Sequence, residues 1–86
     1  MSHILIILEA IETLESKSAD PPTGAQVSLM EALQAADEYA HDNPDSEILA
    51  VIEQQATFIK SYLDVVNPPS DIRLQSYANA LDGIVP

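Results

Sequence analysis

The longest stretch of the sequence with a single periodicity is residues 43–66, NPDSEILAVIEQQATFIKSYLDVV. Asn43 is a favourable N-cap, and Pro44 suits the first helical position because its missing N–H would have no partner there. Glu47 adds negative charge near the start, which interacts favourably with the helix dipole. Two prolines follow the stretch and cannot continue a helix. The stretch therefore predicts a helix over residues 44–66, capped by Asn43.

Apolar side chains cover more than half of this predicted helix. One stripe has helical spacing and comprises Ile48, Ile52, Gln55, Ile59, Tyr62 and Val66. A second stripe lies beside it and comprises Val51, Gln55, Phe58, Tyr62 and Val65. Such a helix needs cover on several sides, and we expect other helices of the chain to cover the second stripe. The alternative is that this stripe is a dimer seam or a partner groove, with Gln55 fixing the register of pairing.

Three further helices are predicted, over residues 2–17, 24–42 and 70–82. The first has a plausible N-cap at Ser2, although isoleucines in residues 3–8 leave a short strand as the alternative. Thr23 with Gln26 is a capping-box pattern at the start of the second. Gly83 is expected to end the last helix in the left-handed conformation. The second helix has a stripe of mostly small residues, so we expect it to pack closely along residues 44–66. That stripe is Leu29, Ala32, Leu33, Ala36 and Ala40.

A similar connection that contains proline precedes each of the second, third and fourth predicted helices. They read DPPT, NPDS and NPPS, and they begin at Asp20, Asn43 and Asn67. This regular spacing predicts consecutive helices that turn back through short loops. The sequence therefore indicates an all-α fold, a compact antiparallel four-helix bundle formed by one domain over residues 1–86. A three-helix bundle with an N-terminal arm is the alternative.

Charge is the unusual feature of the composition. Fourteen Asp and Glu residues oppose only Lys17, Lys60 and Arg73, for a net charge of −11. This field disfavours nucleic acid and anionic membranes as direct partners and favours a basic protein. No apolar run is long enough for a signal peptide or a membrane span, so we expect a soluble, cytoplasmic protein.

Motifs for catalysis or cofactor binding are weak. Glu38 and His41 have the Glu-x-x-His spacing found twice in di-iron four-helix bundles, but the only other histidine, His3, has no such partner. We interpret His41 as a favourable residue near the carboxyl end of a helix. Ser28 resembles the attachment serine of acyl carrier proteins, although Val27 replaces the aspartate of their Asp-Ser-Leu motif. We therefore expect no enzymatic activity, no cofactor and no metal.

The acidic residues are the best candidates for partner binding, with solubility alone as the alternative explanation. The candidate acids are Glu9, Glu12, Glu15, Glu31, Glu38 and Asp42. In size, acidity and helical content the chain resembles bacterial nuclease immunity proteins and phage-encoded inhibitors, although the acidic Tyr-Tyr segment of colicin nuclease immunity proteins is absent. The resemblance implies a small inhibitor, immunity or adaptor module that blocks a basic, nucleic-acid-binding protein. The alternative is a structural or assembly protein that self-associates through the second stripe.

Overall fold

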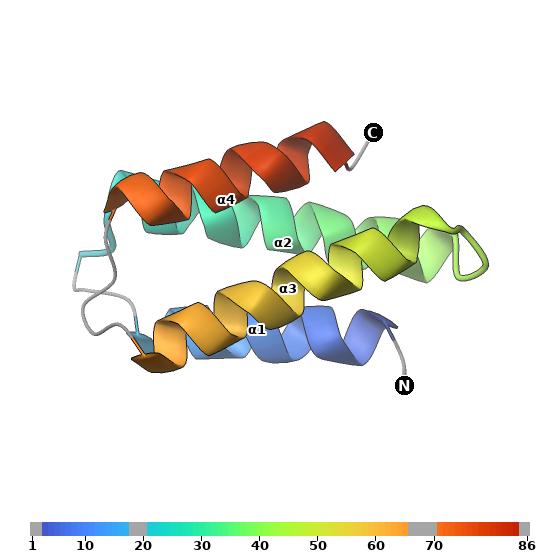
Figure 1. Ribbon diagram of the computed structural model, residues 1–86, viewed down its shortest axis with the longest axis horizontal. Helices are drawn as coiled ribbons and strands as arrows, with labels where there is room; N and C mark the ends of the chain where they lie inside the picture. Colours follow the sequence, from blue (N-terminus) through green and yellow to red (C-terminus); the bar gives the residue numbers. More distant parts are fainter. Residues whose placement is uncertain (1–2, 18–20, 66–70, 85–86) are drawn as a thin grey trace.

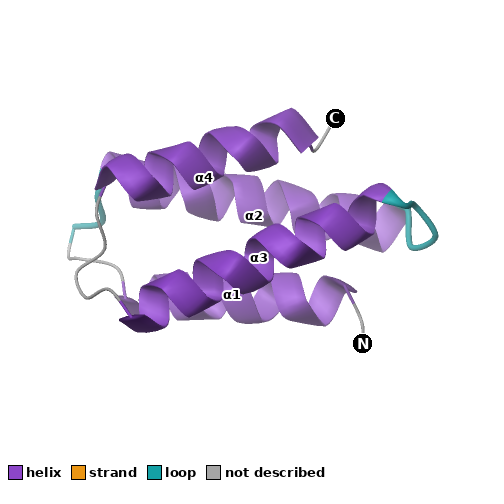
Figure 2. Cartoon of the chain, viewed as in Figure 1, coloured by secondary structure: helices purple, strands orange, loops and turns teal. Residues whose placement is uncertain are grey.

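The computed structural model describes residues 3–17, 21–65 and 71–84, and four helices account for most of them. They are α1 (His3–Lys17), α2 (Gly24–Asp42), α3 (Ile48–Val65) and α4 (Asp71–Ile84) (Figure 1). The described residues contain no strand, so the alternative of a strand over residues 3–8 is wrong (Figure 2). The predicted all-α four-helix bundle is confirmed.

The helices form two layers of two, with α1 and α2 behind α3 and α4 in the view of Figure 1. Within the bundle, α1 packs against α2 and α3, and α2 packs against α1 and α4. The side between α3 and α4 is more loosely packed. Consecutive helices run in opposite directions, so α1 points the same way as α3 and α2 the same way as α4. Because α3 and α4 make the fewest contacts among neighbouring helices, their side is the least closed side of the bundle.

The small-residue stripe of α2 packs differently from the prediction. Leu29, Leu33 and Ala36 are fully buried, but α2 and α3 lie diagonally across the bundle and make few contacts. The stripe instead lets α2 pack closely with α1 and α4. Small residues indicate where a helix can be approached closely, but they do not identify which helix approaches.

The predicted capping box at the start of α2 is confirmed. The backbone N–H of Gln26 donates to Thr23 Oγ1 at 3.2 Å, and the backbone N–H of Thr23 donates to Gln26 Oε1 at 2.8 Å. These bonds explain why the polar side chain of Gln26 is only 3% exposed. The local sequence therefore sets the start of α2.

The start of α3 differs from the prediction, which placed Asn43 as its N-cap and Pro44 inside it. Asn43 instead ends α2, with both its amide N–H and its Nδ2 donating to the Tyr39 carbonyl. Residues 43–47 then form the turn, in which the Ser46 amide donates to the Asn43 carbonyl, and α3 begins at Ile48. The predicted boundaries left one residue to reverse the chain between antiparallel helices, which is too few.

The last helix also extends further than predicted. It continues through Gly83 to Ile84, and Gly83 does not adopt the left-handed conformation. Ile84 is half-buried and packs against the core, which favours two more helical residues over a cap at Gly83. The predicted positions of Ser2, Ser70 and Val66 lie outside the described residues.

The core side of α3 is the largest correction to the sequence analysis. Its buried residues are Leu49, Ile52, Ala56, Ile59 and Leu63. Only Ile52 and Ile59 belong to the predicted first stripe, whereas Gln55 and Tyr62 are half-buried. The buried stripe is rotated around the helix relative to the predicted one. Leu49, Ala56 and Leu63 face the core because α1 packs on that side of α3.

Candidate functional site

The second stripe of α3 lies largely at the surface. Val51 is 42% exposed, Phe58 55% and Val65 84%. The expectation that helices of the same chain cover these three residues is wrong, because the contacts of α3 with α4 are sparse. Gln55 and Tyr62 are half-buried, so the stripe is only partly covered.

An aromatic cluster joins α3 to α4 on this side. Tyr77 of α4 packs edge-on against both Phe58 and Tyr62, with ring centroids 5.3 Å and 5.5 Å apart. The guanidinium carbon of Arg73 lies 5.8 Å from the centroid of the Tyr62 ring, which is a cation–π distance. The Tyr77 hydroxyl oxygen is buried and has no hydrogen-bond partner among the described residues. Sequence periodicity identified Phe58 and Tyr62 but could not pair them with α4.

Five of the six predicted partner-binding acids are exposed on the layer formed by α1 and α2. Glu12 and Glu15 lie on α1, and Glu31, Glu38 and Asp42 lie on α2. Within the described part of the chain none of the five forms an ion pair. We call these five residues the acidic surface.

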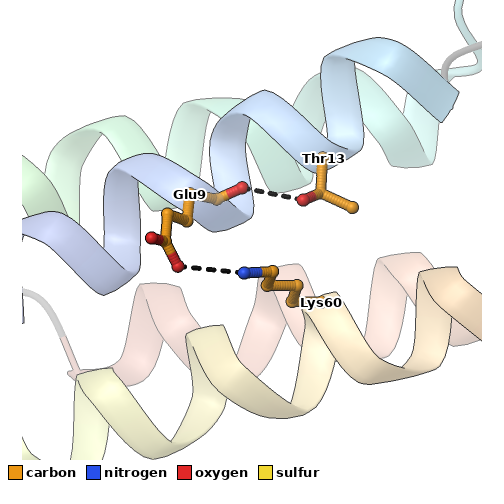
Figure 3. A network of polar contacts seen from close by, with 3 residues as sticks. All are labelled: Glu9, Thr13 and Lys60. Carbon is orange, nitrogen blue, oxygen red and sulfur yellow. Dashed lines mark hydrogen bonds and ion pairs between the residues drawn. The ribbon is translucent and has the colours of Figure 1, made fainter.

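Glu9, the sixth predicted acid, has a partner within the bundle. Lys60 of α3 donates to Glu9 Oε2 at 2.9 Å, and Thr13 donates to the Glu9 carbonyl oxygen (Figure 3). The hydrogen bond and the negative charge of Glu9 both raise the pKa of Lys60. Glu9 is therefore partly neutralised, and its role differs from that of the acidic surface. The pairing depends on α1 and α3 being neighbours, which the sequence does not show.

Asp37 is an acidic residue that the sequence analysis did not single out. It is half-buried on α2, and its Oδ1 has no hydrogen-bond partner among the described residues. Burial raises the pKa of Asp37, the charge of His41 opposes this shift, and Glu38 reinforces it. The i, i+4 spacing of Asp37 and His41 was the signal available in the sequence, whereas the sequence analysis considered only the spacing of Glu38 and His41 and set it aside.

Histidine and carboxylate side chains do not gather into a metal-binding group of three or more in the described part of the chain. His3 Nδ1 contacts a carboxylate oxygen of Glu53, which links the start of α1 to α3. Ser28 is half-buried on α2 in the second turn of that helix. Among the described residues, no helix has both the length and the apolar character needed to cross a membrane.

Comparison of the chain with protein-family models, with curated proteins and with solved structures finds no match in any of the three.

Proposed function

We propose that this chain is a small protein-binding module of the inhibitor, immunity or adaptor kind that acts in the cytoplasm. Its partner is a basic protein, of the type that binds nucleic acid. The module covers the basic surface of that partner, so that its bulk and its negative field together keep nucleic acid away. No turnover is involved.

The acidic surface is the observation that carries this proposal. Its five carboxylates are exposed on two adjacent helices, and none has an ion-pair partner among the described residues. In a chain of net charge −11 they contribute an outward field that speeds encounter with a positive surface. Such exposed charges are screened over about 10 Å at 0.1 M salt, so binding through them must weaken as salt rises.

Two variants with the same net charge test where the partner binds. The first carries Glu31→Gln, Glu38→Gln and Asp42→Asn, which remove three charges from the acidic surface. The control carries Glu47→Gln, Asp64→Asn and Asp82→Asn, which remove three charges from exposed positions elsewhere. Each protein is used as bait in a lysate of the source cells, washed in parallel at low and high salt. Bound proteins are identified by mass spectrometry.

We expect the wild type and the control to retain a basic protein at low salt and to release it at high salt. The acidic-surface variant should retain much less of it. Equal losses for both variants would mean that net charge alone, and not this surface, controls binding. Recovery of the bait protein alone, with no basic partner, would contradict the proposal.

A further inference from the structure

The outer face of α3 is nearly free of charge although the chain is strongly acidic. Its exposed residues between positions 50 and 65 are Ala50, Val51, Gln54, Thr57, Phe58, Ser61, Asp64 and Val65. Asp64 is the only charged residue among these eight, whereas the exposed face of α2 includes Glu31, Glu38 and Asp42. A face with few charges and with exposed Val and Phe side chains is typical of an interface and not of a solvated surface.

This face also has the shape needed to receive a side chain from another helix. A shallow depression of about 330 Å³ is lined by Glu53, Gln54, Thr57, Phe58 and Ser61. Four of these residues have the i, i+3, i+4, i+7 spacing, counting from Gln54. Four residues so spaced form the hole that accepts one side chain in knobs-into-holes packing of two helices.

The three exposed apolar side chains larger than Ala on this face are evenly spaced around Phe58. Val51 lies seven residues before Phe58 and Val65 seven residues after it, while polar Gln54 and Ser61 occupy the positions between. When two identical helices pair in antiparallel fashion, each residue before the midpoint faces one after it in the other copy. Val51 would then face Val65 of the second copy, Gln54 would lie near Ser61, and Phe58 would face Phe58 of the second copy, at the depression that it helps to line.

We propose that two copies of this chain associate through the outer faces of α3, antiparallel about a two-fold axis at Phe58. Such an interface is isologous, because the same patch on each copy contacts its own equivalent. The sequence analysis gave a dimer seam that includes Gln55 and Tyr62 as an alternative. In the structure both residues are half-buried, and Tyr62 contacts Tyr77 of α4.

Charge favours a second copy over a basic partner on this face. A basic partner gains from carboxylates, and this face offers only Asp64 and the edge residue Glu53. Two copies with a net charge of −11 each repel one another, and this face brings their surfaces together with few facing charges. Because salt screens the remaining repulsion, self-association must strengthen as salt rises. The acidic surface of α1 and α2 lies in the other layer and stays free in each copy.

The matched pair Val51→Glu and Val27→Glu tests the interface. Val51 on α3 is 42% exposed and Val27 on α2 is 39% exposed, so the two variants make the same chemical change at similar exposure. The mass of each protein is measured by sedimentation equilibrium from about 0.1 M to about 0.5 M sodium chloride, and thermal unfolding confirms that each is folded. We expect a wild-type dimer that tightens with salt. Val51→Glu should raise its dissociation constant at least about tenfold, because it buries a carboxylate, whereas Val27→Glu should not.

The double variant Val51→Lys/Val65→Glu tests the orientation. In the antiparallel arrangement the introduced ammonium group at position 51 faces the introduced carboxylate at position 65 of the second copy, so this variant should dimerise more tightly than Val51→Glu. In a parallel arrangement like charges would meet, and it should remain monomeric. A wild type that stays monomeric in high salt would overturn the proposal, as would equal weakening by Val27→Glu and Val51→Glu. A pull-down that recovers no basic partner would contradict the proposed function but not this inference. The two surfaces lie in different layers, and their binding changes with salt in opposite directions.

Discussion

Alanine substitutions at two adjacent residues of α3 should lower the stability by different amounts. The smaller side chain should cause the larger loss. Ile59 is fully buried between helices, whereas Phe58 is 55% exposed. We compare Ile59→Ala with Phe58→Ala, each of which removes most of one apolar side chain from the same turn. The comparison tests which face of α3 belongs to the core.

The expected losses follow from burial. Replacing a buried Ile by Ala typically costs about 2–5 kcal/mol, because the transfer energy is lost and a cavity remains. Fully burying a Phe side chain contributes about 1.5–3 kcal/mol, of which Phe58 realises less than half. Its edge-on contact with Tyr77 adds about 0.5–1.5 kcal/mol. We therefore expect about 3 kcal/mol for Ile59→Ala and about 2 kcal/mol, the middle of the summed range, for Phe58→Ala.

Thermal and urea unfolding followed by circular dichroism measure both losses, at low salt and low protein concentration so that self-association does not contribute. At about 4–8 °C per kcal/mol for a domain of this size, Ile59→Ala should lower Tm by roughly 12–24 °C. Val65→Ala on the same helix is the control, and it should change the stability little because Val65 is 84% exposed. A larger loss for Phe58→Ala than for Ile59→Ala would refute the assignment of the core face.

Three further predictions concern single polar groups. Thr23→Ala should cost about 1 kcal/mol in urea unfolding because it removes the capping acceptor of α2, and an unchanged midpoint would show that the capping box adds no stability. Tyr77→Phe should leave stability unchanged or raise it by up to about 1 kcal/mol, since the buried hydroxyl has no partner among the described residues; a loss above that size would indicate a bond the hydroxyl makes. Burial raises the pKa of Asp37 in the folded protein, so the stability that its protonated form contributes is lost as pH rises above 3.8 through the folded-state pKa. Asp37→Asn should therefore have a higher Tm than the wild type at pH 7 and the same Tm at about pH 3. A wild type more stable than the variant at pH 7 would contradict this.

Much of the fold could be predicted from local sequence because its signals act over a few residues. The capping box at Thr23 sets the start of α2, and the regularly spaced prolines mark the turns between helices. The start of α3 was predicted wrongly because Asn43 can cap either of the two helices it separates. In the structure Asn43 donates two hydrogen bonds to the Tyr39 carbonyl and so ends α2, and the Asn43 carbonyl accepts from Ser46 within the turn that follows.

For the candidate surfaces too, helical periodicity predicts exposure but not contacts between residues far apart in the sequence. Exposure of the acidic surface follows from its position opposite the apolar stripes of α1 and α2, so helical periodicity was sufficient to find it. The pairing of Glu9 with Lys60 could not be found, because the two residues are 51 positions apart and meet only where α1 packs on α3. The raised pKa of Asp37 likewise depends on its burial in the bundle.

Local sequence patterns are sufficient to predict four helices and a negative electrostatic field. The packing of the helices is needed to establish which side of α3 faces inward. Ala56 and Ala50 have the same side chain, yet the first is buried and the second is exposed. Periodicity shows that α3 is apolar over a wide arc, but the direction of the core is set by where α1 packs. That position depends on contacts between residues far apart in the chain, which no local pattern encodes.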